Sequence, residues 1–276
     1  MQLVEQHIIK RSDARFAPID AAAFASKNLY NAALYLVRQT FIFENRYLPF
    51  ETVYHQMKGH EAYKVLPAKV AQQVLRLMDK NWQSYFATCE AYQEDPSKFR
   101  THPKMPHYKH KAAGRYALVY TMQVLSRPGL KRGVIAPSRL PITVQTQQCP
   151  AAIAQVRIVP RMGFYVVEVV YEQAEATPSD NPALSAAVDI GVDNLAAITS
   201  NKKGFLPRLV NGRPIKSTNQ YYNKRKAELQ TALGHEGTTA RLERFTAKRT
   251  HRINHLVNSL KSEQVWPSNV STCPQS

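Results

Sequence analysis

Apolar side chains recur at helical spacing in two stretches near the N-terminus. After a short strand expected over 2–10, the first stretch predicts a helix over about 21–46, with Asp20 as its cap. The second runs from Pro67 to Asp95 and predicts a longer helix. The two helices are expected to pack together through their apolar faces, with Cys89 buried among them.

The pattern changes to that of strands between residues 116 and 171. Ile153–Val159 and Phe164–Tyr171 are rich in Val, Ile and Tyr, and they flank a turn at Pro160–Gly163. These features predict a β-hairpin. Short segments near 116–125 and 141–145 would complete a small antiparallel barrel with it.

The C-terminal third is predicted to be a separate domain. Residues 174–182 are rich in Ala, Thr, Pro, Ser and Asp, as linkers are. Residues 186–200 predict a strand, a tight turn and a second strand. Two helices are expected over 219–233 and 239–256, separated by glycines at 234 and 237, before a polar tail from residue 262.

Composition points to a polyanionic partner. The 276 residues include 44% hydrophobic ones, which excludes wholesale disorder, but 37 Lys and Arg oppose only 20 Asp and Glu, a formal charge of +17. Nucleic acid is the leading partner and an anionic membrane the second. No run of 18 apolar residues exists, so we expect no membrane span. The absence of signal-peptide features and the three dispersed cysteines indicate a cytoplasmic protein without a disulfide framework or a zinc site.

Basic residues are concentrated in two segments. Residues 96–115 hold three prolines and many cations, which predicts a loop that contacts phosphate. Residues 201–252 carry thirteen Lys and Arg against three Glu, a net charge of +10. The predicted nucleic-acid contacts are Lys104, Lys109, Lys111, Arg115, Lys202, Lys203, Lys224, Arg225, Lys226 and Arg249.

Other readings of these segments stay open. The cations of residues 201–252 also fit ordinary solvated helix faces. Interleaved aromatic rings fit either stacking on unpaired bases or core packing; they are Tyr108, Tyr116, Tyr221 and Tyr222. A metal site formed by four histidines is disfavoured because no carboxylate or cysteine joins His60, His102, His107 and His110.

Asp189 is the unusual residue of the C-terminal third. It ends an otherwise apolar strand, where a buried carboxylate must be paired or bound to metal. Asp193, four residues later, is typical of a turn. The segment around them, Val188–Ala196, resembles the first motif of the RuvC-like nuclease domain of TnpB/OrfB proteins of bacterial insertion sequences. Supporting pieces are Tyr30-Asn31, Pro103–Lys109, Ile158–Pro160 with Gly163–Tyr165, and Asn219–Lys224.

The resemblance, which extends over about residues 2–255, implies an α+β multidomain protein related to RNA-guided DNA endonucleases. It implies a wedge-like β-barrel over 1–18 and 96–173 and a helical insertion over 19–95. A linker over 174–183 and an incomplete RuvC-like, RNase H-fold α/β domain over 184–276 would follow. The implied partners are guide RNA and DNA, with no small-molecule substrate.

The implied chemistry is metal-dependent cleavage of DNA. Asp189 matches the first catalytic carboxylate and hence a Mg²⁺ ligand, whereas the family's second and third carboxylates and zinc ribbon find no match here. We therefore expect a C-terminally truncated, catalytically incomplete chain in which the family pattern ends after His255. The alternatives are a non-catalytic RNA- or DNA-binding module that regulates the intact element, and a non-functional remnant.

Overall fold

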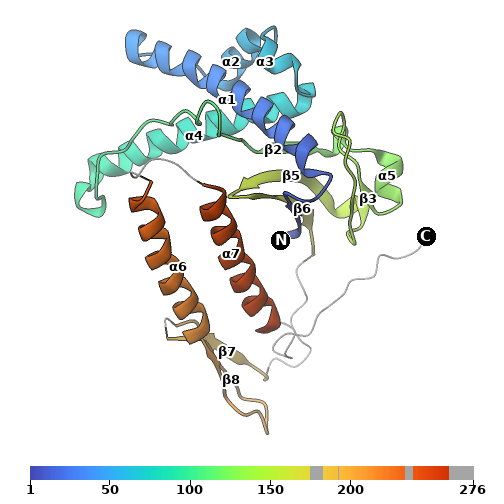
Figure 1. Cartoon of the computed structure of the whole chain (residues 1–276), viewed down its shortest axis with the longest axis vertical. Helices are drawn as coiled ribbons and strands as arrows, with labels where there is room; N and C mark the ends of the chain where they lie inside the picture. The colour runs from blue at the N-terminus through green and yellow to red at the C-terminus, as the bar shows by residue number, and fades with distance from the viewer. Residues whose placement is uncertain (175–182, 192, 234–238, 261–276) are drawn as a thin grey trace. The chain divides into compact units, whose positions relative to one another are not determined.

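The computed structural model describes residues 1–174, 183–191, 193–233 and 239–260, without the side chains of 259 and 260 (Figure 1). Residues 175–182 of the predicted linker over 174–183, the helix break at Gly234 and Gly237, and the tail lie outside these residues. The chain divides into two compact units, Met1–Gln173 (unit 1) and Ala174–Ser276 (unit 2). The finer domain boundaries remain predictions. In the described part of the chain, no helix has the length and apolarity needed to cross a membrane.

Four helices form one part of unit 1, and their labels and colours can be followed in Figure 1. They are α1 (Phe16–Glu44), α2 (Phe50–Met57), α3 (Glu61–Lys64) and α4 (Ala68–Glu94). The apolar stripe of α4 is buried from Val70 to Trp82, and the Trp82 ring packs 5.2 Å from that of Phe41 on α1. Helix–helix packing therefore follows the sequence prediction in the first four turns of α4.

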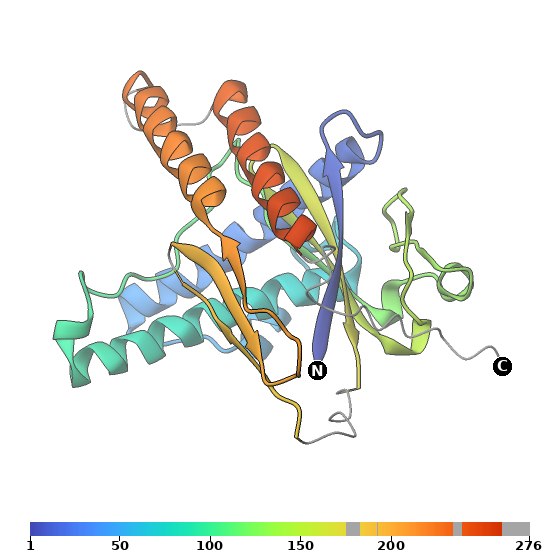
Figure 2. The ribbon, with the colours of Figure 1, turned by 90° about the horizontal axis from the view of Figure 1, so that it is seen from below.

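A four-stranded antiparallel sheet forms the other part of unit 1, with the strand order β1-β6-β5-β2. The strands are β1 (Gln2–Lys10), β2 (Leu118–Thr121), β5 (Ile153–Arg161) and β6 (Phe164–Glu172). Smaller elements between them are η1 (Pro96–Lys98), η2 (Met122–Val124), α5 (Arg127–Lys131), β3 (Val134–Ile135), β4 (Val144–Gln145) and η3 (Pro150–Ala152). Figure 2 shows the long β1 strand from below, beside the β5–β6 hairpin.

The predicted closed barrel is wrong, because the main sheet of unit 1 is open. β1 and β2 are its two edge strands, and β3 and β4 pair only with each other. Residues 122–152 contain four prolines, which lack the backbone N–H that a continuous strand needs. This segment therefore makes only two-residue strands and cannot close the sheet.

Local features differ from the sequence prediction at two positions. α1 begins at Phe16, so Asp20 lies inside the helix instead of capping it. Cys89 is half-buried, because the stripe of α4 leaves the core after Trp82. The β5–β6 hairpin is confirmed, and Gly163 takes a positive φ of 86° in its turn, a conformation that glycine adopts without strain.

Asp20 joins three parts of unit 1. Its carboxylate accepts hydrogen bonds from Nε and Nη2 of Arg115, at 2.9 and 2.7 Å, and from the Tyr165 hydroxyl on β6 at 2.7 Å. The Arg115 guanidinium lowers the pKa of Asp20, despite partial burial. Burial, and after it the hydrogen bond to the Asp20 carboxylate, raises the pKa of Tyr165. A single carboxylate thus fixes α1 to β6 and to the segment before β2.

We expect Asp20→Asn to lower the free energy of unfolding by about 1–3 kcal/mol at neutral pH, because charge-assisted hydrogen bonds are lost. The pKa of Asp20 is below its unfolded value, so its stabilisation is present above about pH 4 and is lost as the pH falls further. Urea titrations at neutral pH and at about pH 3 measure this effect. A variant equally destabilised at both pH values would contradict it.

Unit 2 combines a small sheet with a helical hairpin. β7 (Ala186–Asp189), β8 (Asn194–Ser200) and β9 (Arg208–Asn211) form an antiparallel sheet in that order. α6 (Arg213–Thr231) and α7 (Ala240–Leu260) follow it. The predicted strand–turn–strand and the two helices are confirmed. The mixed α and β composition of the expected fold class is also found, whereas the RuvC-like identity of unit 2 remains a prediction.

Candidate nucleic-acid interface

Residues 103–111, called the strap below, are held along α1 by side chains of that helix. The Asn31 amide donates to the Lys109 carbonyl at 2.8 Å and accepts from the Lys109 N–H at 2.9 Å. The buried Lys27 ammonium donates to the Lys111 carbonyl at 2.6 Å, and burial lowers its pKa. The segment predicted as a basic loop is therefore a loop whose backbone is fixed to α1 at residues 109 and 111.

The four predicted cations of this region have different surroundings. Lys104 and Lys111 are exposed. Lys109 is half-buried, with its ammonium 5.5 Å from the centroids of two tyrosine rings. Arg115 is engaged by Asp20, so its charge is already neutralised within unit 1. Lys104, Lys109 and Lys111 thus remain the better candidates for phosphate contacts.

α6 and α7 pack through an aromatic seam. The Tyr222 ring stacks on Phe245 at a centroid distance of 5.4 Å, and its hydroxyl lies 3.0 Å from Oγ1 of Thr246. Arg249, predicted to contact nucleic acid, donates from Nε to Oδ1 of Asn219 at 2.9 Å, with its guanidinium 5.4 Å from the Tyr222 centroid. Its half-buried side chain therefore contributes to the seam.

The other predicted cations of unit 2 also fall into two classes. Arg225 forms an ion pair with Glu228 one turn later, and the Lys226 ammonium lies 6.0 Å from the Tyr222 centroid. Both are half-buried. Exposed side chains are those of Lys202, Lys203 and Lys224.

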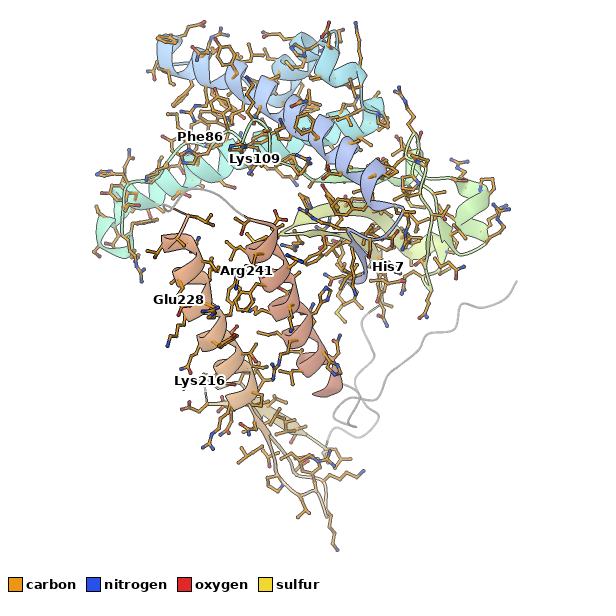
Figure 3. The ribbon with its side chains drawn as sticks, viewed as in Figure 1. His7, Phe86, Lys109, Lys216, Glu228 and Arg241 are labelled. Atoms are coloured by element: carbon orange, nitrogen blue, oxygen red, sulfur yellow. The ribbon has the colours of Figure 1, made fainter. Side chains whose placement is uncertain are left out.

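Four further cations form a line along α7. They were not among the nucleic-acid contacts predicted from the sequence. We call them the α7 stripe: Arg241, Arg244, Lys248 and Arg252. All are exposed, and none forms an ion pair within the described residues. Their spacing of three, four and four residues places them on one helix face over about 16 Å. Figure 3 labels Arg241 at the start of α7, and Lys216 and Glu228 on α6. The helical spacing of cations is the signal that would have found this stripe.

The four tyrosines considered for base stacking divide evenly. Tyr108 is 44% exposed and Tyr221 is 61% exposed, so both remain candidates. Tyr116 packs on Tyr30 at a centroid distance of 4.3 Å, and burial raises its pKa to about 12. Tyr222 is buried in the α6–α7 seam. For these last two the core-packing interpretation holds.

Asp189 is exposed, so the expectation of a buried carboxylate is wrong. Its backbone pairs with Ala197 across the sheet, and its carboxylate makes no hydrogen bond or ion pair within the part of the chain that the structure describes. Asp193 behaves as a turn residue: its carbonyl accepts from Gly212 N, and its carboxylate binds the Lys216 ammonium at 2.7 Å. Lys216 lowers the pKa of Asp193 and so ties the β7–β8 turn to α6.

The donor set around Asp189 does not by itself fit a two-metal site. Mg²⁺ takes six oxygen ligands and two-metal hydrolysis needs shared carboxylates, whereas Asp189 offers a single carboxylate. Across the described ranges, no three His, Cys, Asp or Glu side chains are grouped as metal ligands. In the histidine-rich segment, the His110 ring accepts backbone N–H groups of residues 112 and 113.

A family model matches part of the chain. Residues 168–264 match OrfB_IS605, a family described as a probable transposase. This segment includes Asp189, β7 to β9, α6 and α7, whereas the quoted motifs at residues 30–31, 103–109 and 158–165 lie outside it. The match passes the point after His255 where the family pattern is expected to end, so that expectation is wrong. No curated protein matches the sequence.

Two solved structures are distantly similar. A Cas12f1 chain in a complex with sgRNA and target DNA is 9% identical, with a TM-score of 0.31 over 95% of this chain and 68% of that one. A CRISPR-Cas12f ternary complex gives 9% identity and a TM-score of 0.31, over 90% of this chain and 59% of that one. At TM-scores this low, we transfer no residue roles from these structures.

Proposed function

We propose that this chain, whose residues 168–264 match OrfB_IS605, binds nucleic acid, with guide RNA and target DNA as its partners. The observation that carries the proposal is the α7 stripe, which lies inside the matched segment. Four exposed cations along about 16 Å of one helix face can contact successive phosphates of a nucleic-acid strand. Phosphate contacts of this kind give affinity without reading sequence.

Neighbouring features support binding to an unpaired strand. Lys224 and Tyr221 are both exposed on α6, the partner of α7 in the hairpin, and Lys202 and Lys203 are exposed between β8 and β9. Single-stranded nucleic acid is bound by cations that follow the backbone together with rings that stack on bases. The α6–α7 seam uses Tyr222 and Arg249 to hold the two helices together, which fixes the stripe in a straight line.

RNA that co-purifies with the protein tests this function. We expect a discrete RNA to remain bound through purification at low salt, to be released at high salt, and to be identified by sequencing. The wild-type chain and a variant with the α7 stripe neutralised are compared in parallel. Recovery of no RNA, or of equal RNA with both proteins, would count against the proposal.

We also propose that Asp189 occupies the metal position of a RuvC-like site and that this chain does not complete that site alone. One exposed carboxylate can bind a hydrated Mg²⁺ weakly, and further ligands must come from elsewhere for cleavage. The alternative of a regulatory binding module is consistent with this proposal. A regulatory module would bind nucleic acid through the same residues and would not cleave it.

In Mg²⁺, the wild type and Asp189→Ala are expected to bind a single-stranded oligonucleotide with affinities within about twofold of each other, since phosphate contacts lie on other residues. Neither protein is expected to cut the bound DNA. Gel analysis of labelled DNA, with the co-purified RNA present, measures both properties. Cleavage by the wild type that Asp189→Ala abolishes would overturn the proposed incompleteness while leaving the proposed binding intact.

A further inference from the structure

A cleft of about 440 Å³ lies in unit 1, between the strap and the exposed face of α4. It is distinct from the α7 stripe, which belongs to unit 2. Its volume lies within the range of small-molecule and nucleotide sites, about 300–1,000 Å³. Figure 3 labels Lys109, one of the strap residues that line the cleft.

The α4 wall of the cleft is polar and uncharged. Asn81, Ser84 and Thr88 follow one another at helical spacing, with Tyr85 beside them. The Ser84 hydroxyl donates to the Lys80 carbonyl at 2.9 Å, and the Thr88 hydroxyl donates to the Ser84 carbonyl at 2.6 Å. Both hydroxyl oxygens therefore keep lone pairs that can accept hydrogen bonds. Such a wall suits the N–H donors on the edge of a base.

The strap wall of the cleft is cationic. Lys104 and Lys109 line it together with His107. Lys104 is exposed, whereas Lys109 is held by its ring contacts and by the two backbone hydrogen bonds to Asn31. The Lys109 part of this wall is thus fixed before any ligand arrives, which lowers the entropic cost of binding there.

One positive wall opposite a neutral, hydrogen-bonding wall with an aromatic ring matches a nucleotide. We propose that this cleft receives one unpaired nucleotide of a bound strand, with its phosphate at Lys104 and its base against Tyr85 and the α4 hydroxyls. The inference rests on the proposed nucleic-acid binding and adds a site to it. A base pair within a duplex keeps its edges paired and its faces stacked, so the cleft selects single strands.

The test uses the full chain and labelled oligonucleotides of about 12 nucleotides, a length within the range of known single-strand sites. Single-stranded RNA, single-stranded DNA and a duplex are compared by fluorescence anisotropy. Ser84→Trp fills the cleft from an exposed helix position, and Lys104→Gln removes a charge without adding bulk. The control, Lys98→Gln, removes the same charge from an exposed position outside the cleft lining.

We expect Ser84→Trp to weaken single-strand binding about tenfold, as when one stacked base is lost, and to leave duplex binding unchanged. Lys104→Gln should make the plot of log affinity against log salt concentration less steep, by the amount that corresponds to about one lost phosphate contact. A 2-aminopurine placed along the strand should be quenched at one position in the wild type and not in Ser84→Trp. If Ser84→Trp lowers the affinity for single-stranded RNA and DNA equally, the cleft recognises the base and the phosphate. A larger loss of affinity for RNA indicates that the cleft also contacts the 2′-hydroxyl.

The two proposals fail differently. If the wild type binds no oligonucleotide, the proposed function fails. If the wild type binds but both cleft variants behave like Lys98→Gln, the cleft inference is overturned and the proposed function stands. Because Lys104→Gln is a small change on the exposed strap, it keeps the test valid even if Ser84→Trp does not fold.

Discussion

Replacing all four residues of the α7 stripe by glutamine is expected to weaken binding of single-stranded RNA by about 10²–10³-fold at about 0.1 M salt. Each phosphate contact on a single strand contributes about 0.7 to the slope of log affinity against log salt concentration, so the slope should fall by about 3. The exposed stripe carries no aromatic core residue, so α7 should remain folded. Anisotropy titrations from about 50 mM to about 200 mM salt measure both quantities.

The matched control removes four exposed cations that are scattered over unit 1: Lys58, Lys64, Lys131 and Arg132. The formal charge falls by the same amount, so a purely non-specific effect of net charge would be the same in both variants. We expect the affinity of the control variant for single-stranded RNA to fall by less than about tenfold, because these four residues do not lie along one bound strand. Equal losses in the two variants would show that net charge, and not the alignment along α7, governs binding.

Trp82→Ala is expected to lower the free energy of unfolding of unit 1 by about 3–5 kcal/mol. Trp82 is fully buried, and its ring lies 5.2 Å from Phe41, 5.7 Å from Phe86 and 5.8 Å from Tyr47. Removing the indole leaves a cavity where α1 and α4 meet. Because the strap depends on α1 for its position, its fixed geometry should be lost together with the helix packing. Urea denaturation followed by circular dichroism measures the change.

Cys89→Ala, two turns further along the same stripe, provides the comparison. The Cys89 side chain is half-buried, so we expect this substitution to lower the free energy of unfolding by less than about 1 kcal/mol. Similar costs at both positions would contradict the placement of Trp82 in the core and Cys89 at its margin.

Elements specified by local pattern were predictable from the sequence. The helix after Pro67 was found because a proline marks its start and helical periodicity continues over many residues. The short strand over 2–10 was found because it ends before the polar residues 11–13. The β5–β6 hairpin was found because two runs rich in Val, Ile and Tyr flank a short turn. Barrel closure was not predictable, because it depends on whether distant edge strands can pair. The proline-rich residues 122–152 prevent that pairing.

The candidate site was predictable in kind but only partly in its residues. Basic composition and the segment around Asp189 indicated the family that residues 168–264 match. The direction in which each cationic side chain points depends on the rotation of its helix about its axis. It also depends on hydrogen-bond and ion-pair partners that are distant in sequence. Arg249 lies in the seam with Asn219, and Arg115 is bound by Asp20, 95 residues earlier. Arg241 and its companions were missed because their significance lies in their common helix face.

The measurement that tests the central claim most directly is the salt dependence of RNA binding by the wild-type chain. We predict that the chain binds a single strand with measurable affinity. The logarithm of this affinity should fall linearly as the logarithm of the salt concentration rises. The slope should correspond to at least the four phosphate contacts of the α7 stripe, that is, about −3 or steeper. Binding that does not change with salt, or no binding at about 50 mM salt, would contradict the claim that this chain grips nucleic acid through its phosphates.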